Sequence, residues 1–358
     1  MKKYVRILAA LLCALMLVSC GAKSAEPVPD EPEKTNEVVP ADAGENSEPV
    51  PADDEESGSP APEAAGDSEM SDAWTPVTLK DDLDREVTLE ARPERVAVLM
   101  GSFAETWLLA GGELIAAPKD AWEDFDLALD ESVTDLGSYQ KVSAEAIFGL
   151  EADLILASAN TKGQVEMKET MESAGLDVLY FNVNGFEDYL RMLKTSTDIT
   201  GRDDLYKANG VKVQEQVEQA KAAAATALEG QEAPRVLFVR TAASGIHVKG
   251  SEGTVLGLML RDLGCVNVAD GSDLLENLSI EKIIEEDPDR IFIVMQGSDQ
   301  EGAQKTLEET LTGNPAWSGL TAVQEGRVHY MDKHLYHLKP NNRWGNAYAE
   351  LEQLLYGE

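Results

Sequence analysis

Short apolar runs of strand length alternate with longer amphipathic stretches from residue 74 onward. The first two runs, residues 77–79 and 87–89, flank Asp81-Asp82 and predict a β-hairpin. Six more runs follow at wide intervals, at residues 96–100, 154–157, 178–181, 236–239, 291–295 and 328–331. Because helix-length segments separate these six runs, the pattern predicts parallel β-α-β units and an α/β fold.

A helix midway through this region divides the strand runs into two sets of three. Residues 203–229 are rich in Ala, Gln, Glu, Lys and Val, contain Gly210 as the main helix breaker, and are followed by Pro234. Such a composition predicts one helix of about 27 residues, roughly 40 Å long. We therefore expect two α/β lobes, residues 74–202 and 231–358, joined by a linking helix at residues 203–230.

An internal repeat indicates that the two lobes are related. Residues 142–155 (VSAEAIFGLEADLI) align with residues 278–291 (LSIEKIIEEDPDRI) at a constant offset of 136. The identical pairs are Ser143 and Ser279, Glu145 and Glu281, Ile147 and Ile283, Asp153 and Asp289, and Ile155 and Ile291. A second match pairs residues 103–111 with 256–264, each predicted as a helix that ends at glycine.

The first twenty residues have the features of an export signal. A basic start, MKKYVR, leads into an apolar run at residues 7–18, which is shorter than the about 20 residues that span a bilayer. The run ends in LVSCG, which resembles a bacterial lipobox and implies that Cys20 becomes the lipidated first residue of the mature protein. Cys13 would leave with the signal, and Cys265, without activating neighbours, is expected to pack in the core.

Residues 21–73 have the composition of a disordered acidic tether. They hold eight of the 15 prolines and 16 acidic residues, against two lysines. A segment so poor in large apolar residues buries too little surface to offset the entropy of ordering. We expect a solvated spacer that reaches about 40 Å or more from the lipid anchor.

Charge and motif content exclude several classes of function. A net charge of -36 argues against nucleic acid as a partner and against adsorption to an anionic membrane, since both require clustered Lys and Arg. The motifs G-x-S-x-G and H-E-x-x-H are absent, and the four histidines lack the spacing and the accompanying cysteines of a zinc site. The segment GIHVKGS (245–251) departs from a phosphate loop and predicts a strand connection. We expect no catalytic residue, no resident cofactor and no structural metal.

Four features together resemble the substrate-binding lipoproteins of bacterial ABC importers for iron–siderophores, haem and cobalamin. They are the lipobox, the segment RVAVLMGSFAETWLLAGG (95–112), the paired S-x-E-x-I segments, and LTGNPAWSGLTAVQEGRVHYM (311–331). The resemblance covers about residues 77–358. It implies a class III periplasmic-binding-protein fold, in which two Rossmann-like lobes joined by one long rigid helix hold the ligand in the cleft between them.

The same resemblance implies a partner and a role for two glutamates. A receptor of this family is a monomer that delivers its ligand to an ABC permease and its ATPase, and a glutamate on each lobe docks onto arginines of the permease. By motif position these are Glu145 and Glu281. Ser143 and Ser279 are also expected as helix N-caps, which would place each glutamate in a first helical turn, where it favours the helix dipole.

Ligands of α/β sheets bind beyond the carboxyl ends of the strands. This rule and the neighbouring loops select Ser102, Phe103, Trp122, Tyr139, Asn160, Asn184, Arg240, Gln296, Tyr336 and His337 as ligand-binding candidates. Arg240 would pair either with an anionic chelator or haem propionate, or with a carboxylate at the rim. Lys339 and Arg343 are expected at the surface. Haem is disfavoured because Gln296-Gly297, without a ligating side chain, follows the 291–295 run, although Tyr139, His247, Tyr336 or His337 would remain available as ligands.

These observations favour a lipid-anchored, extracytoplasmic receptor that captures a ferric siderophore. A haem or corrinoid cargo is the near alternative, and a bare Zn or Mn ion is disfavoured because a His and carboxylate set is missing. From other classes, a surface-anchored enzyme on a chelatase-like fold and a cell-surface adhesin remain open.

Overall fold

The computed structural model describes residues 74–276 and 278–357, and its strands follow the apolar runs of the sequence. The predicted signal peptide with Cys20 and the predicted tether lie outside the described residues. The predicted hairpin is present: β1 (Val77–Lys80) pairs antiparallel with β2 (Glu86–Leu89). All six predicted strand runs are also strands of the structure.

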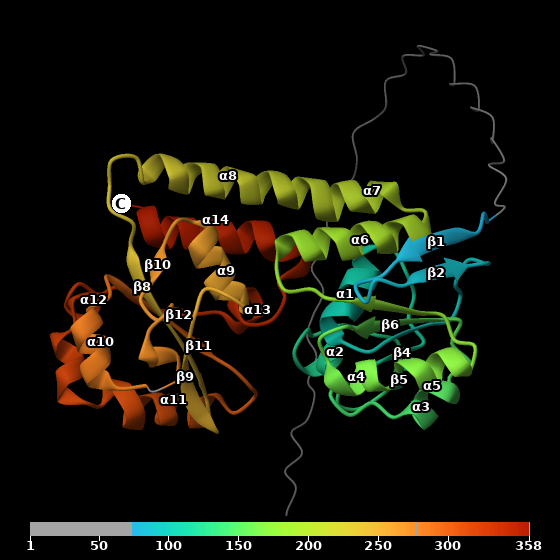
Figure 1. Ribbon diagram of the computed structural model, residues 1–358, viewed down its shortest axis with the longest axis horizontal. Coiled ribbons are helices and arrows are strands. Elements are labelled where there is room, and N and C mark those ends of the chain that lie inside the picture. The colour runs from blue at the N-terminus through green and yellow to red at the C-terminus, as the bar shows by residue number, and fades with distance from the viewer. Residues whose placement is uncertain (1–73, 277, 358) are drawn as a thin grey trace, which may run out of the picture. The chain divides into compact units, whose positions relative to one another are not determined.

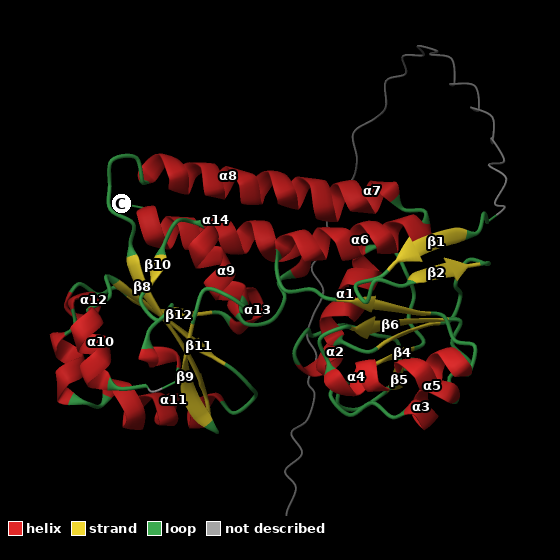
Figure 2. Cartoon of the chain, viewed as in Figure 1, coloured by secondary structure: helices red, strands yellow, loops and turns green. Residues whose placement is uncertain are grey.

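The first lobe, which we call the N-lobe, contains a parallel sheet with strand order β5-β4-β3-β6-β7 (Figures 1 and 2). Its strands are β3 (Val96–Val98), β4 (Ala116–Ala117), β5 (Thr134–Asp135), β6 (Leu154–Ser158) and β7 (Val178–Phe181). Its helices are α1 (Gly101–Leu109), α2 (Asp120–Glu123), α3 (Ala144–Phe148), α4 (Lys162–Glu166), α5 (Lys168–Ser173) and α6 (Phe186–Thr200). The sequence did not predict β4 and β5, because two-residue strands carry no periodic signal.

The second lobe, the C-lobe, has the parallel order β10-β8-β11-β12, with β9 antiparallel to β8. Its strands are β8 (Arg235–Ala242), β9 (Gly245–Lys249), β10 (Val266–Asn267), β11 (Arg290–Met295) and β12 (Val328–Met331). Its α-helices are α9 (Val255–Asp262), α10 (Ile280–Glu286), α11 (Gln300–Leu307), α12 (Thr321–Gln324), α13 (Lys333–Tyr336) and α14 (Trp344–Tyr356). Shorter helical turns are η2 (Asp273–Leu275), η3 (Glu308–Thr312), η4 (Pro315–Gly319) and η5 (Asn341–Arg343). The segment GIHVKGS thus begins as β9, the second strand of a hairpin with β8.

The linking helix predicted at residues 203–229 is helical from residue 203 to residue 227. It consists of α7 (Asp203–Tyr206), one π-helical turn η1 (Lys207–Val211) and α8 (Lys212–Ala227). Gly210 lies in the π turn, where an added Cβ would come within 3.0 Å of the Tyr206 ring and 3.2 Å of Leu193 on α6. The glycine that weakens the sequence signal therefore allows the linking helix to approach α6 closely.

The internal repeat corresponds to matching hydrogen bonds in the two lobes. Ser143 and Ser279 cap α3 and α10, and their hydroxyls accept hydrogen bonds from the third backbone N–H beyond each serine. The carboxylates of Asp153 and Asp289 accept hydrogen bonds from the backbone N–H groups of Arg95 (2.9 Å) and Arg235 (2.7 Å), which lead into β3 and β8. These equivalent contacts confirm the pseudo-symmetry that the sequence predicted.

One apolar core extends through both lobes. It contains Phe181 of the N-lobe, Phe238 of the C-lobe and Val217 of the linking helix, all buried. Helix α14 packs along α8 (Figure 1), and Trp344 at its start lies 6.0 Å from the ring of Phe186 at the start of α6. The lobes are therefore joined by packed side chains as well as by the linking helix.

A buried polar contact also joins the two lobes. Glu105 on α1 is 8% exposed, and the guanidinium of Arg343 donates to both of its carboxylate oxygens, at 2.7 and 3.1 Å. The side chain of Asn341, also buried, donates to Glu105 (2.5 Å) and to the carbonyl of Ser102 (3.0 Å). The expectation that Arg343 is a free surface charge is therefore wrong, because its partner is a buried carboxylate on the other lobe.

This contact yields the first prediction. Glu105→Ala leaves the Arg343 guanidinium without its acceptor and removes one of the two acceptors of the Asn341 amide. We expect the free energy of unfolding to fall by about 2–3 kcal/mol. Urea denaturation of the mature protein measures the change, and Glu113→Ala, at an exposed position of the same lobe, is the control. Equal stability of the two variants would show that the contact does not hold the lobes together.

Candidate ligand-binding cleft

A cavity of about 200 Å³ lies at the carboxyl end of β8 and is lined by residues of both lobes. Its basic residues are Arg240, His337 and Lys339 of the C-lobe, and Asn184 of the N-lobe also lines it. The other lining residues are Phe238, Gly253, Thr254, Val255 and Tyr336. The structure therefore brings Arg240, Asn184, Tyr336 and His337, four of the ligand-binding candidates, to one site.

Arg240 is an uncompensated cation within the described residues. No carboxylate in residues 74–276 or 278–357 forms an ion pair with Arg240. The Nε atom of Arg240 is buried and has no hydrogen-bond partner among these residues. Burial lowers the pKa of Arg240 below its ordinary value. The sequence left two roles open for Arg240, a contact with an anionic ligand or a salt bridge at the rim. The salt bridge is not formed within the described residues.

Two more titratable groups line the cavity beside Arg240. Burial lowers the pKa of Lys339, and the carboxylate of Asp188 opposes this effect. Burial and the nearby charges of Arg240 and Lys339 lower the pKa of His337 to about 4, so that its imidazole is neutral at pH 7. The expectation that Lys339 is a surface charge is therefore wrong, because its side chain is partly buried in this cavity.

The charges at this site indicate the kind of ligand it can accept. A desolvated cation without a counter-ion costs free energy, and an anionic group that accepts its hydrogen bonds offsets that cost. Carboxylate and phosphate oxygens match the donors of a guanidinium and an ammonium group. The cavity is therefore suited to an anionic ligand, although the chain as a whole is strongly acidic.

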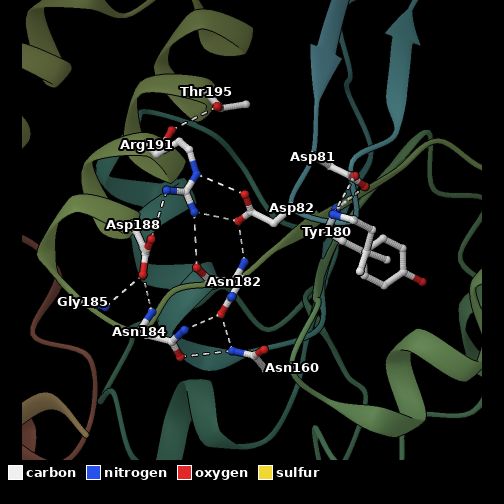
Figure 3. Close-up of polar contacts among 11 residues, drawn as sticks. Asp81, Asp82, Asn160, Tyr180, Asn182, Asn184, Gly185, Asp188, Arg191 and Thr195 are labelled. Carbon is white, nitrogen blue, oxygen red and sulfur yellow. Dashed lines mark hydrogen bonds and ion pairs between the residues drawn. The ribbon is translucent and has the colours of Figure 1, made fainter. Parts of the chain in front are cut away.

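Three asparagines form a polar cluster on the N-lobe, and one of them, Asn184, lines the cavity (Figure 3). Asn160 follows β6, and Asn182 and Asn184 follow β7, so all three lie at the carboxyl edge of the sheet. The Nδ2 of Asn160 donates to Oδ1 of Asn182 and to Oδ1 of Asn184 (3.1 Å), and the Nδ2 of Asn184 donates to Oδ1 of Asn182 (2.7 Å). This arrangement offers exposed amide groups to a polar ligand.

An ion-pair network fixes the backbone beneath the asparagines (Figure 3). The carboxylate of Asp82 accepts from the backbone N–H of Asn182 (2.6 Å), and that of Asp188 accepts from the backbone N–H of Asn184 (2.9 Å). Arg191 on α6 donates to Asp82 (2.9 Å) and to Asp188 (3.0 Å), and so connects the two carboxylates. The asparagine cluster is thus ordered without a ligand, which reduces the entropic cost of any contact that Asn184 makes with one.

A second hollow, of about 510 Å³, lies at the ends of β11 and β12. Met295, Tyr330 and His334 line it, and Tyr330 is 54% exposed. Lys333, also in its lining, forms a 3.2 Å ion pair with Asp124 of the N-lobe. These residues were not among the predicted ligand-binding candidates, because Tyr330 lies within the predicted 328–331 strand run and the others carry no motif.

Asp120 on α2 is another group that the sequence did not indicate. Its Oδ2 accepts a hydrogen bond from the backbone N–H of Gly101 (2.9 Å), just beyond β3, and its Oδ1 is buried without a partner among the described residues. Burial raises the pKa of this carboxyl to about 6. Nothing in its local sequence distinguishes Asp120 from the exposed acidic residues around it.

Two ligand-binding candidates belong to the core. For Phe103 the expectation of a ligand contact is wrong: the residue is buried, and its ring packs edge to face on Phe181 at 6.2 Å. Tyr336 is also buried, and its hydroxyl donates to the carbonyl of Ala347 (3.1 Å), so it is a wall of the cavity and not a ligating phenol. Phe103 lies in the first turn of α1 and Tyr336 ends α13, positions where a side chain can turn inward as easily as toward the cleft.

The remaining candidates lie outside the 200 Å³ cavity. Ser102 is buried on α1, and Trp122 on α2 packs against the shared core. Tyr139 and Gln296 are partly exposed in loops, and Asn160 is exposed just after β6. Over the described part of the chain, no group of three or more His, Cys, Asp or Glu residues is placed to hold a metal ion. Cys265 is buried, and burial raises the pKa of its thiol to about 12.

The two glutamates assigned to docking are exposed, in the first turns of α3 and α10. Glu281 accepts a hydrogen bond from the Ser279 hydroxyl (2.7 Å), which lowers its pKa.

The fold and the cleft define a two-lobed ligand-binding protein. The periplasmic binding protein family matches this chain over residues 96–335, and the chain belongs to that family. This confirms the fold class that the sequence implied.

Similar proteins cover most of the folded region. A cobalamin-binding protein of Halobacterium salinarum is 25% identical over 260 residues, which is 71% of this chain and 67% of that protein. The Fe(3+)-citrate-binding protein YfmC of Bacillus subtilis is 25% identical over 257 residues, 70% of this chain and 77% of YfmC. The solved structure of the siderophore-binding protein BauB with acinetobactin and ferric iron superposes with a TM-score of 0.64 at 21% identity, covering 79% of this chain and 99% of BauB.

The cleft also yields a prediction on pH. Because the pKa of His337 is about 4 in the folded state and about 6.5 when unfolded, the unfolded chain binds the extra proton between these values, and stability falls as the pH falls. We expect the free energy of unfolding of the wild type to fall by on the order of 1–2 kcal/mol from pH 7 to pH 5 because of His337, and we expect this fall to be absent in His337→Gln. Urea denaturation at both pH values measures it, with His334→Gln as the control. The same pH dependence in wild type and His337→Gln would contradict a buried neutral imidazole.

Proposed function

We propose that this protein is the substrate-binding component of an ABC importer and that it captures an anionic iron chelate, a ferric siderophore or a related carboxylate complex. The observation that carries the proposal is the unpaired Arg240 beside Lys339 in a cavity lined by both lobes. Membership of the periplasmic binding protein family supports the receptor role. The names of YfmC and BauB, which refer to Fe(3+)-citrate and to a ferric siderophore, support the class of cargo.

The size and openness of the site favour partial burial of the cargo. The 200 Å³ cavity holds only part of a chelate, such as one carboxylate arm, and the rest of the cargo would remain exposed to solvent. The iron would arrive already coordinated by its chelator, which is consistent with a cleft that supplies hydrogen-bond donors. The role is binding and delivery, and we assign no catalytic residue.

A haem cargo is the second candidate, and one observation favours it. The neutral imidazole of His337 lies in the same cavity as Arg240 and Lys339, so one site holds a possible axial ligand and two cations for propionates. A corrinoid is the third, suggested by the name of the Halobacterium salinarum relative.

The proposal includes an extracytoplasmic location. The lipobox ending in Cys20 predicts a lipid anchor, and the acidic segment at residues 21–73 would serve as the tether. Within the described residues, no helix has the length and apolar character needed to span a bilayer. The partners would be the membrane permease and its ATPase, with the receptor acting as a monomer.

A binding panel tests the cargo class. We expect ferric citrate, a ferric siderophore, or else haem or cobalamin, to quench the intrinsic Trp and Tyr fluorescence of the mature protein saturably, at about one molecule per chain. Arg240→Gln with Lys339→Gln should weaken binding of the anionic cargo at least ten-fold, because charge-assisted hydrogen bonds are worth about 1.5–3 kcal/mol each. Lys212→Gln on the exposed side of α8 is the control.

The outcomes of the panel separate the candidates. Absence of saturable binding of every panel member up to high micromolar concentration would overturn the proposed function. Saturable haem binding, with a Soret band that is lost in His337→Ala, would show that the cargo is haem and not an iron chelate.

The docking role of the glutamates is a separate prediction. Glu145→Arg with Glu281→Arg should leave cargo affinity near wild type and lower uptake in cells at least five-fold, because the cationic partner groups would then meet like charges. Raised salt should weaken wild-type docking in the same direction. The control, Glu215→Arg with Glu229→Arg on the linking helix region, makes the same change of net charge. Equal uptake by the two double variants would contradict the docking role.

A further inference from the structure

Exposed apolar side chains mark the same position in the two repeats. Five large apolar residues are exposed in the part of the chain that the structure describes, and two of them are Phe148 on α3, at 40%, and Ile284 on α10, at 41%. They are equivalent under the 136-residue offset that also relates Glu145 to Glu281. Each lies three residues after its glutamate, so glutamate and apolar side chain are neighbours on one helix face.

Neither helix needs this exposed residue for its own packing. Ile147 and Ile283, the preceding residues, are fully buried and are also equivalent under the repeat. Each helix thus has a buried isoleucine that anchors it to its lobe and an exposed apolar residue that faces solvent. Because single exposed apolar residues are common, only their recurrence at one repeat position beside an exposed glutamate carries information.

The local charge indicates the partner. Glu145 and Glu281 are exposed, and the one basic residue of α3 and α10, Lys282, is held by Asp273 at 2.6 Å. Two acidic sites would repel a second copy of this chain and an anionic lipid surface. They match a protein with basic side chains, and the repetition on two pseudo-symmetric lobes matches a partner with two equivalent halves.

We infer that Phe148 and Ile284 are the apolar anchors of the docking surface for the permease, each inserting into a pocket beside a basic side chain on one half of that protein. The inference rests on the proposed function, because it takes the importer's permease as the partner. In this arrangement the glutamates steer and orient the encounter, while the desolvated apolar side chains supply the larger share of affinity at the centre of each contact.

The test places a photo-reactive benzoylphenylalanine at position 148, 284 or 266 of the full-length protein in its own cells. Val266 is the control position, because it is 49% exposed on β10 and belongs to neither helix. We expect positions 148 and 284 to cross-link to one and the same polytopic membrane protein, and position 266 not to label it. We also expect Glu145→Arg with Glu281→Arg to reduce the yield at least ten-fold. Different targets at the two positions, or equal labelling from position 266, would overturn the inference.

A second measurement uses the membrane protein identified in this way, purified in detergent. Phe148→Gln with Ile284→Gln should weaken its association with the receptor at least ten-fold, whereas Val266→Thr should leave it unchanged. Both variants should bind the cargo panel as wild type does and show unchanged stability, because the substituted side chains are exposed. If the double variant associates with the membrane protein as tightly as wild type does, the proposed role of Phe148 and Ile284 as apolar anchors is wrong.

Failure of this inference is distinguishable from failure of the proposed function. If no panel member binds but positions 148 and 284 still label one membrane protein, the docking surface stands and the cargo assignment fails. If cargo binds and the labelling does not discriminate between positions, the receptor function stands and the docking surface fails.

Discussion

The geometry of the cleft depends on the contact between the buried carboxylate of Glu105 and the side chains of Arg343 and Asn341. Glu105 belongs to α1 of the N-lobe, yet its partners Arg343 and Asn341 lie in the segment that leads into α14. That segment follows directly after His337 and Lys339, so the contact fixes the stretch of chain that carries both residues toward Arg240. Burial of the carboxylate makes the arrangement stiff, because the partners cannot separate without leaving the charge of Glu105 poorly solvated.

The cleft itself contrasts with the rest of the chain in its electrostatics. A protein with a net charge of -36 places two cations, Arg240 and Lys339, and the neutral imidazole of His337 in one small cavity, and neither cation forms an ion pair within the described residues. On the facing lobe, three asparagines offer amide groups without adding charge. In the proposed function, selectivity for an anionic cargo would come from this local field, while the distant acidic residues would disfavour random association with polyanions.

The fold was predictable because its signals are local. Apolar runs located the longer strands, and the serine and aspartate positions of the repeat correspond to caps and backbone contacts in both lobes. The cleft was predictable only in part. The strand-end rule selected Arg240 and Asn184, but side-chain direction at helix starts sent Phe103 inward. Arg343 depends on Glu105, more than 200 residues away, and the position of Lys339 depends on the cavity between the lobes, so no local pattern encodes either.

The apolar core that passes from lobe to lobe has a consequence for transport kinetics. Phe181, Phe238 and Trp344 belong to one packed cluster, so the lobes cannot swing apart without exposing it to water. The distance between α3 and α10 is then nearly the same in the empty and the loaded receptor. In the proposed importer, an empty receptor would therefore present the same docking helices as a loaded one and would compete with it for the permease.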